Sequence, residues 1–180
     1  MKPIFIFFRF ILFYFRATTR YRVHSPFVFD FIQSVLEDDR NYYVFPKLEK
    51  LRKALLNNKN RIEVTDFGAG SQVINSQQRQ ISQMAKSSLT PPPYCQLLFR
   101  LIVYYRPKYL LELGTSFGIS TLYQAMTDTQ SRMITIEGCE KVANIACNHF
   151  QLLGAKNIQL INGPFDERLP QALKQLKQLD

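Results

Sequence analysis

The chain has 180 residues, of which 46% are hydrophobic and 21% are charged, and this balance excludes a disordered protein. The length fits one domain with a core, or one domain plus a small helical preface. The three cysteines form no CxxC pair and the two histidines are far apart in the sequence. Neither a disulfide framework nor a metal site is therefore expected, and a reducing, cytoplasmic location is predicted.

The net charge of +9 is unevenly distributed. Before the first acid, Asp30, the chain carries Lys2, Arg9, Arg16, Arg20 and Arg22. Such a segment attracts anionic lipid or nucleic acid, or forms the basic flank of a helix that packs on the main domain. Five charges are common on soluble proteins, which favours the second interpretation, and no nucleic-acid partner is expected.

Residues 4–15 (IFIFFRFILFYF) are almost wholly apolar. Twelve residues interrupted by Arg9 are too few for the roughly 20 that span a bilayer, and no A-x-A cleavage site follows. Two alternatives stay open. One is an interfacial helix, with peripheral membrane contact through residues 1–22. The other is an apolar helix or strand that docks on a partner or on the fold itself.

Residues 1–93 are expected to form a mostly helical N-terminal preface. Ser25 and Pro26 are a typical N-cap and first-turn pair. The expected elements, in chain order, are a helix over 26–38, a helix over 46–57, a strand over 62–67 and a polar helix over 76–88. Three consecutive prolines at 91–93 then mark the expected domain boundary.

Residues 94–180 alternate between helical and strand patterns. The expected order is a helix over 96–105, a strand over 109–113, a helix over 119–126, a strand over 133–137, a helix over 140–153, a strand over 157–161 and a helix over 167–176. Alternation at this spacing indicates βαβ units with a parallel sheet. Right-handed crossovers predict the strand order 3-2-1, and the fold class is α/β with a Rossmann-like sheet.

Two glycine loops could hold a nucleotide: Gly68-Ala-Gly70 and the stretch from Gly114 to Gly118. A Rossmann-type site also needs an acid at the end of the next strand, about 20 residues on. Glu137 lies 19 residues beyond Gly118 and ends an apolar strand. No acid lies between Phe67 and Leu111, and no second strand is expected before the prolines. The second loop is the predicted cofactor site.

The second loop does not match a dinucleotide site. It has two glycines rather than the three of G-x-G-x-x-G, and no P-loop Lys-Ser/Thr pair follows. A carboxylate, Glu112, precedes Gly114 by two residues. S-adenosylmethionine has no phosphate but carries an ammonium, a carboxylate and a sulfonium. A nearby carboxylate and backbone groups suit that ligand better than a pyrophosphate.

Residues 98–169 resemble the class I methyltransferases of the catechol O-methyltransferase type. The motifs are Leu111-Glu-Leu-Gly114, Gly118-Ile-Ser120-Thr121, Thr135-Ile-Glu137, Leu153-Gly154, Asn162-Gly163 and Leu169-Pro170. Their order and spacing together are specific, while any one alone is not. The stretches 24–29 and 68–71 also resemble uncharacterised bacterial members of this superfamily. The resemblance implies a methyltransferase that uses S-adenosylmethionine to methylate an oxygen of a small-molecule acceptor.

The resemblance also implies a cofactor-binding set: Glu112, Gly114, Ser116, Gly118, Ser120, Glu137, Gly138, Phe165 and Asp166. Gly114 and Ser116 would line the methionine portion and Ser120 would reach its carboxylate. Glu137 would hold the ribose with Gly138 beside it, and the 165–166 pair would flank the adenine. Structural roles stay open as alternatives: a strand-end cap for Glu112, a first-turn position for Ser120 and the core for Phe165.

In the resembling family the catalytic groups lie after strands four and five. The chain ends at Asp180, about where strand four should begin, so a truncated member with an exposed sheet edge is expected, and with it a homo-oligomer. Catalytic residues stay unassigned, because Lys86, Tyr94 and Asp66 are each better explained as structural. The rival hypotheses are a non-enzymatic or membrane-associated binding protein and, third, an NAD-dependent oxidoreductase.

Overall fold

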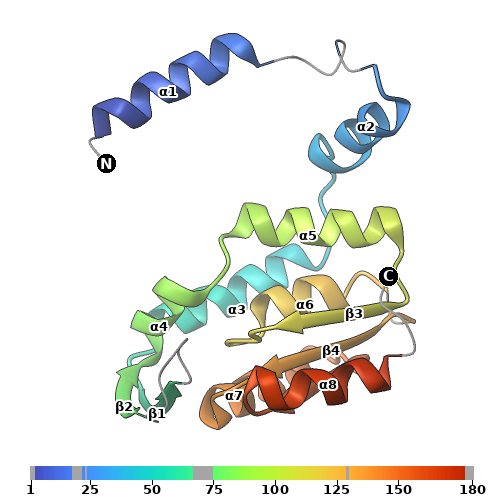
Figure 1. Ribbon diagram of the computed structural model, residues 1–180. Helices are drawn as coiled ribbons and strands as arrows, with labels where there is room; N and C mark the ends of the chain where they lie inside the picture. Colours follow the sequence, from blue (N-terminus) through green and yellow to red (C-terminus); the bar gives the residue numbers. More distant parts are fainter. Residues whose placement is uncertain (1–2, 18–21, 23, 67–74, 129, 177–180) are drawn as a thin grey trace. The chain divides into compact units, whose positions relative to one another are not determined.

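A computed structural model describes residues 3–17, 22, 24–66, 75–128 and 130–176 (Figure 1). The first glycine loop, Gly68 to Ser71, lies outside these residues. The chain divides into two compact units, residues 1–39 and 40–180. The domain boundary expected near residue 93 lies inside the second unit, and the division of the chain there stays a prediction.

The first unit is helical. Its helices are α1 (Pro3–Arg16), α2 (Pro26–Phe31) and the π-helix η2 (Ile32–Leu36). The Ser25 hydroxyl accepts a 3.4 Å hydrogen bond from the Val28 amide, and Pro26 opens α2, so the predicted cap is confirmed. Within the described residues, no helix is both long enough and apolar enough to cross a bilayer.

The second unit is built on a parallel sheet of β3 (Tyr109–Leu113), β4 (Arg132–Glu137) and β5 (Ile158–Asn162). The strand order is β3-β4-β5. These are the first, second and third strands of residues 94–180, so the predicted order 3-2-1 is confirmed. The central strand β4 is buried from Met133 to Ile136, as a parallel strand covered on both faces should be.

Helices cover both faces of this sheet (Figure 1). They are α5 (Pro92–Tyr105), α6 (Ile119–Ala125), α7 (Glu140–Leu152) and α8 (Phe165–Gln175). On one face, Ala172 and Leu176 pack with Ile134 and Ile136 of β4. On the other, residues of α6 and α7 pack in a larger core that includes Leu160 of β5. The architecture is therefore the predicted Rossmann-like α/β fold.

The segment before α5 contains α3 (Phe45–Asn57), β1 (Arg61–Asp66), β2 (Asn75–Gln80) and α4 (Ile81–Ser88). The strands β1 and β2 pair antiparallel, with Arg61 opposite Gln80. The predicted helix over 76–88 is wrong for residues 76–80. That stretch has no apolar side chain and so no periodicity, and backbone pairing with β1 makes it a strand.

A buried polar cluster ties α3 to α5 and α6. The Arg52 side chain is buried and donates to Glu49 Oε1 at 2.9 Å and to the Thr90 carbonyl at 2.7 Å. The Tyr123 hydroxyl donates to the same Glu49 oxygen at 2.8 Å, and burial followed by this hydrogen bond raises the pKa of Tyr123. Arg52, Glu49 and the Tyr123 hydroxyl thus each have a partner within this cluster, which offsets their desolvation.

Candidate functional site

The loop from Gly114 to Gly118 joins β3 to α6 through three residues with left-handed backbone angles. Their φ values are +91° at Gly114, +50° at Ser116 and +80° at Gly118. A Cβ on Gly118 would lie 2.5 Å from the Phe150 ring, so glycine allows this turn to pack closely against α7. The second glycine thus has a packing role, and its φ favours glycine as well.

A hydrogen bond from His149 of α7 holds the same loop. Its Nδ1 lies 2.9 Å from the Phe117 carbonyl oxygen. A carbonyl oxygen can only accept, so Nδ1 carries the proton of the neutral ring. Burial lowers the pKa of His149, with the Phe117 hydrogen bond opposing it. The imidazole therefore serves as a fixed donor that positions the loop.

Glu137 ends β4 and its carboxylate lies beside the glycine loop. Oε2 accepts a 2.8 Å hydrogen bond from the Ser116 amide, and Oε1 accepts a 3.0 Å hydrogen bond from the Cys139 amide. One carboxylate thus joins the loop after β3 to the loop after β4. The carboxyl ends of adjacent parallel strands meet at one edge, which brings the two loops together. A carboxylate has about four acceptor positions, and these two bonds leave room for ligand hydroxyls.

Asn162, at the end of β5, fixes the loop after β4 from the other side. Its Nδ2 donates to the carbonyl of Glu137 at 2.8 Å and to that of Gly138 at 3.2 Å. The Gly163 amide adds a 3.0 Å hydrogen bond to the Glu137 carbonyl. The Asn-Gly pair noted in the sequence therefore positions the acid rather than extending toward a ligand.

Both carboxylate oxygens of Glu112 accept hydrogen bonds from protein side chains. One carboxylate oxygen accepts from Ser120 Oγ at 2.8 Å and Gln124 Nε2 at 2.9 Å. The other accepts from Thr121 Oγ1 at 2.5 Å and Thr135 Oγ1 at 2.8 Å. Burial raises the pKa of Glu112, and these hydrogen bonds oppose the rise. Protein donors thus fill all of its acceptor positions and fasten α6 to the sheet.

A cleft of about 690 Å³ opens at this edge of the sheet. Its lining residues are Val64, Thr65, Arg79, Met84, Ser88, Ser116, Glu137, Gly138, Cys139, Val142, Pro164, Phe165 and Asp166. Five of the nine predicted site residues are among them. Glu112, Gly114, Gly118 and Ser120 are not, although a Cβ on Gly114 would lie 4.0 Å from the Phe165 ring. Their cofactor roles stay predictions.

One wall of the cleft comes from β1, β2 and α4, which the sequence did not assign to the site. Val64 and Thr65 belong to β1, Arg79 to β2, and Met84 and Ser88 to α4. No motif marks these residues, and they precede the glycine loop by 26 to 50 positions. Predicting them would have required knowing that β1 packs beside α7. At the start of α7, the Sγ atom of the N-cap residue Cys139 lies 3.9 Å from the Glu63 carbonyl oxygen.

Ser88 and Ser116 join that wall to the glycine loop through a 3.0 Å hydrogen bond between their hydroxyls. The Ser88 hydroxyl also donates to the Met84 carbonyl at 2.8 Å. Because a hydroxyl has one proton, Ser88 must accept from Ser116. The Ser116 hydroxyl therefore has its proton committed and offers only lone pairs to a further partner. It is prepared to accept from a donor such as an ammonium group.

No side chain of the cleft is assigned as a catalytic base. Lys86 and Tyr94 are exposed and do not line the cleft. Asp66 ends β1, and its side chain lies outside the described residues. Among the residues that the structure describes, no group of three His, Cys, Asp or Glu side chains could hold a metal ion.

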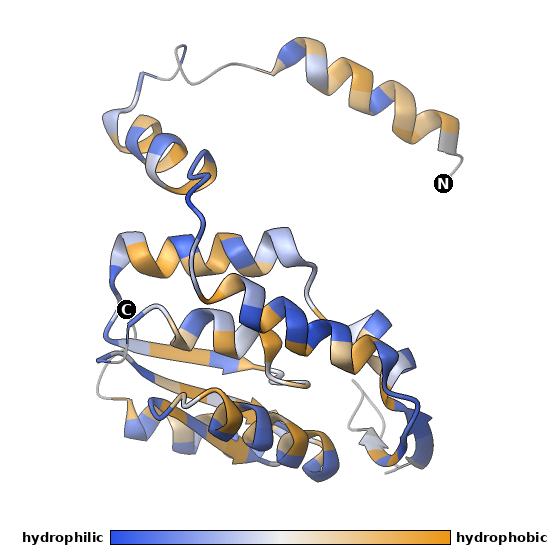
Figure 2. Ribbon diagram, turned by 180° about the vertical axis from the view of Figure 1, so that it is seen from behind, coloured by the Kyte–Doolittle hydropathy of each residue, from blue (hydrophilic) through white to orange (hydrophobic). Residues whose placement is uncertain are grey.

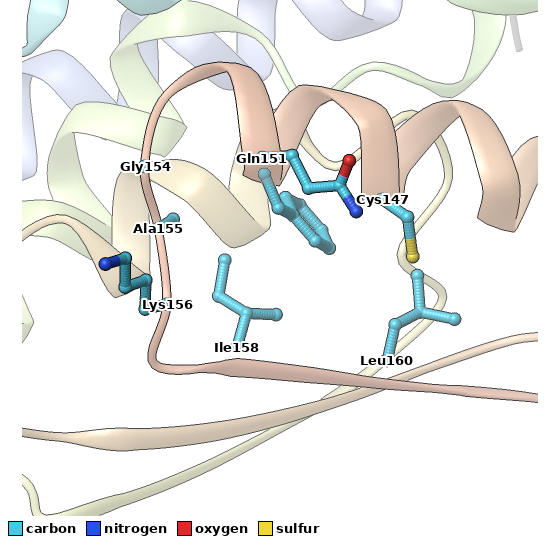
Figure 3. Close-up of a pocket in the computed structure, with 8 residues that line it drawn as sticks. Cys147, Gln151, Gly154, Ala155, Lys156, Ile158 and Leu160 are labelled. Atoms are coloured by element: carbon cyan, nitrogen blue, oxygen red, sulfur yellow. The ribbon is translucent and has the colours of Figure 1, made fainter.

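A second pocket, of about 480 Å³, lies between α7 and β5 (Figure 3). Apolar side chains from both elements, such as Phe150 of α7 and Leu160 of β5, line it together with Cys147 and Lys156. It has neither a carboxylate nor a strand-to-helix glycine loop in its lining. The cleft beside Glu137 is therefore the candidate site.

Comparisons with known proteins bear on the fold of this chain. No protein-family model matches the chain. Over 82 residues, 44% of this chain and 32% of the relative, it is 39% identical to the O-methyltransferase hkm8 of Aspergillus hancockii. The SAH-bound methyltransferase PaMTH1 of Podospora anserina aligns with a TM-score of 0.53 and 14% identity, over 86% of this chain and 56% of that one. An O-methyltransferase from Bacillus cereus in complex with SAH aligns with a TM-score of 0.49 and 18% identity, over 81% and 53%.

The chain thus spans less than two thirds of each of these proteins. Its α/β architecture is the Rossmann-like fold of the class I methyltransferases, and the resemblance seen in the sequence is confirmed at that level.

Proposed function

We propose that the cleft beside Glu137 binds S-adenosylmethionine and that the protein methylates an oxygen of a small molecule. The observation that carries this proposal is the Glu137 carboxylate, which two backbone amides hold at the edge of the cleft. The relative hkm8 is named an O-methyltransferase, and PaMTH1 is described with SAH bound. Both support the proposal.

The donors and acceptors of the cleft fit this cofactor. Glu137 has acceptor positions left for two ribose hydroxyls, and the Ser116 hydroxyl has lone pairs for an ammonium. The exposed ring of Phe165, at the start of α8, offers an apolar surface for adenine. A pyrophosphate would instead meet two carboxylates, Glu137 and Asp166, in the lining. These features favour S-adenosylmethionine over a nicotinamide dinucleotide.

When bound, the cofactor would supply the methyl group, which leaves the sulfur as it bonds to the acceptor oxygen, while the hydroxyl proton passes to a base. This chain contributes alignment of the two reactants. We assign cofactor binding to residues 94–180 and the facing wall to residues 40–93. Val64 and Met84 make part of that wall apolar, which suits an acceptor with an apolar or aromatic surface.

Association of copies through the edge of β3 stays a prediction.

Isothermal titration of the purified chain with S-adenosylmethionine and with NAD tests the proposal. We expect heat with S-adenosylmethionine, displacement of that ligand by its demethylated product, and no heat with NAD. Heat with NAD alone would favour an oxidoreductase. Heat with neither ligand would overturn the proposal in favour of a non-enzymatic binding protein.

The Ser88–Ser116 hydrogen bond gives a second prediction. In Ser88→Ala, the Ser116 hydroxyl loses its acceptor and is free to rotate, so its lone pairs no longer face a fixed direction. One hydrogen bond contributes about 1 kcal/mol, so we expect the affinity for S-adenosylmethionine to fall about fivefold. The control is Ser87→Ala, whose hydroxyl bonds to carbonyls of its own helix. Equal titration curves for the two variants would contradict the role given to Ser88.

A further inference from the structure

The α1 helix carries an unusual amount of exposed apolar surface. Ten of its side chains are between 53% and 81% exposed: Ile4, Phe5, Ile6, Phe7, Phe8, Phe10, Leu12, Phe13, Tyr14 and Phe15. Figure 2 shows the helix in hydrophobic colours along most of its length, with short hydrophilic interruptions. Contiguous apolar surface of this kind marks a protein or membrane interaction site.

The charges of α1 lie on one side. Arg9 and Arg16 are seven residues apart, which is about two helical turns, so they share a face. Phe7 and Tyr14 each precede one of these arginines by two residues, a rotation of about 200°, and so lie on the opposite face. Phe5 precedes Arg9 by four residues, a net rotation of about 40°, and the Arg9 guanidinium lies 5.4 Å from the centre of its ring, so Phe5 lies beside the basic stripe. The helix is therefore apolar over most of its circumference and basic along one stripe.

This pattern favours a membrane surface over a protein groove as the partner of α1. A groove on a protein covers one face of a helix, whereas the apolar side chains here extend around most of α1. Its 14 residues span about 21 Å, less than the roughly 30 Å of a bilayer core, so the helix cannot cross it. Aromatic rings with arginine are the composition of helices at the headgroup level. No acid precedes Asp30 in the chain, so the charge complements anionic lipid.

We infer that α1 lies in the plane of an anionic membrane surface, with Phe7 and Tyr14 toward the acyl chains and Arg9 and Arg16 toward the headgroups. This inference is independent of the proposed methyl transfer, because it rests on α1 alone. It gives the protein a peripheral attachment that places the second unit near a membrane.

Cosedimentation of the full chain with vesicles tests the attachment. We expect binding to equimolar phosphatidylcholine and phosphatidylglycerol that is at least about tenfold tighter than binding to phosphatidylcholine alone and that weakens in high salt. The double variant Arg9→Gln, Arg16→Gln should lose this preference. Phe7→Asp should lose binding, whereas the control Leu152→Asp, at an exposed apolar position of α7, should keep it. Equal binding of Phe7→Asp and the unaltered chain would overturn the inference.

The absence of tryptophan from the sequence allows a direct measurement of orientation. We expect the fluorescence of Phe7→Trp to shift to the blue on anionic vesicles and to be quenched by lipids brominated deep in the acyl chain. Phe5→Trp, beside the basic stripe, should be quenched more by shallow labels. Equal depth at both positions would overturn the in-plane orientation. A blue shift without vesicles, with a dimer in sedimentation velocity and no vesicle binding, would instead assign α1 to contact between copies.

Discussion

Glu137→Ala is expected to reduce binding of S-adenosylmethionine below the limit of detection by isothermal titration. The proposal gives this carboxylate two hydrogen bonds from ribose hydroxyls, each worth about 1.5–3 kcal/mol for a charged acceptor. The loss of about 3 kcal/mol corresponds to more than about 100-fold in affinity. The substitution also releases the amides of Ser116 and Cys139, which loosens both loops of the cleft.

The control for this variant is Glu140→Ala. Glu140 is an exposed acid in the first turn of α7, three residues from Glu137, and it does not line the cleft. Its replacement removes the same charge and should leave the titration unchanged. Thermal melts of both variants separate a loss of binding from a loss of fold. A Glu137→Ala protein that melts normally and binds with unaltered affinity would remove Glu137 from the site.

Gly118→Ala is expected to destabilise the fold by about 3 kcal/mol. Alanine at a φ of +80° costs about 1–2 kcal/mol, and a Cβ placed 2.5 Å from the Phe150 ring adds about 1–3 kcal/mol of overpacking. For a chain of this size the melting temperature should fall by about 6–12 °C. The measurement is a thermal melt followed by circular dichroism.

Gly154→Ala provides the matched control. Gly154 also has a positive φ, +69°, but a Cβ there would meet no atom within 4 Å. Its replacement therefore measures the backbone cost without the clash, and the melting temperature should fall less than in Gly118→Ala. If the two variants have the same melting temperature, close packing of the glycine loop on α7 makes no contribution to stability.

The parallel sheet could be predicted from the sequence because burial on both faces leaves continuous apolar runs. Met133 to Ile136 is such a run, interrupted by Thr135 alone, and Glu137 directly after it is conspicuous as an acid at the end of a buried strand. The structure places the Glu137 carboxylate beside the glycine loop, where it accepts from the Ser116 amide, as its spacing predicts. Strong local patterns of this type need no long-range information.

The strand β2 shows where such patterns end. Its six residues are polar, and its pairing with β1 uses backbone groups, which are the same for every sequence. Its contribution to the cleft, Arg79, comes from tertiary packing. Glu112 has the same limitation in another form. Its position places it in the predicted cofactor-binding set, and that role stays a prediction. In the structure its carboxylate accepts from four side chains, among them Thr121 of α6 and Thr135 of β4. Spacing along the chain does not reveal which lone pairs the fold has already used.

The two walls of the cleft come from separate stretches of the sequence, residues 64–88 before α5 and residues 116–166 after it. Selection can therefore act on them separately. Substitutions in β1, β2 and α4 can change the shape offered to an acceptor while Glu137 and its two backbone amides remain in place. A lineage of such proteins could diversify its chemistry through the earlier stretch while it inherits the later one unchanged.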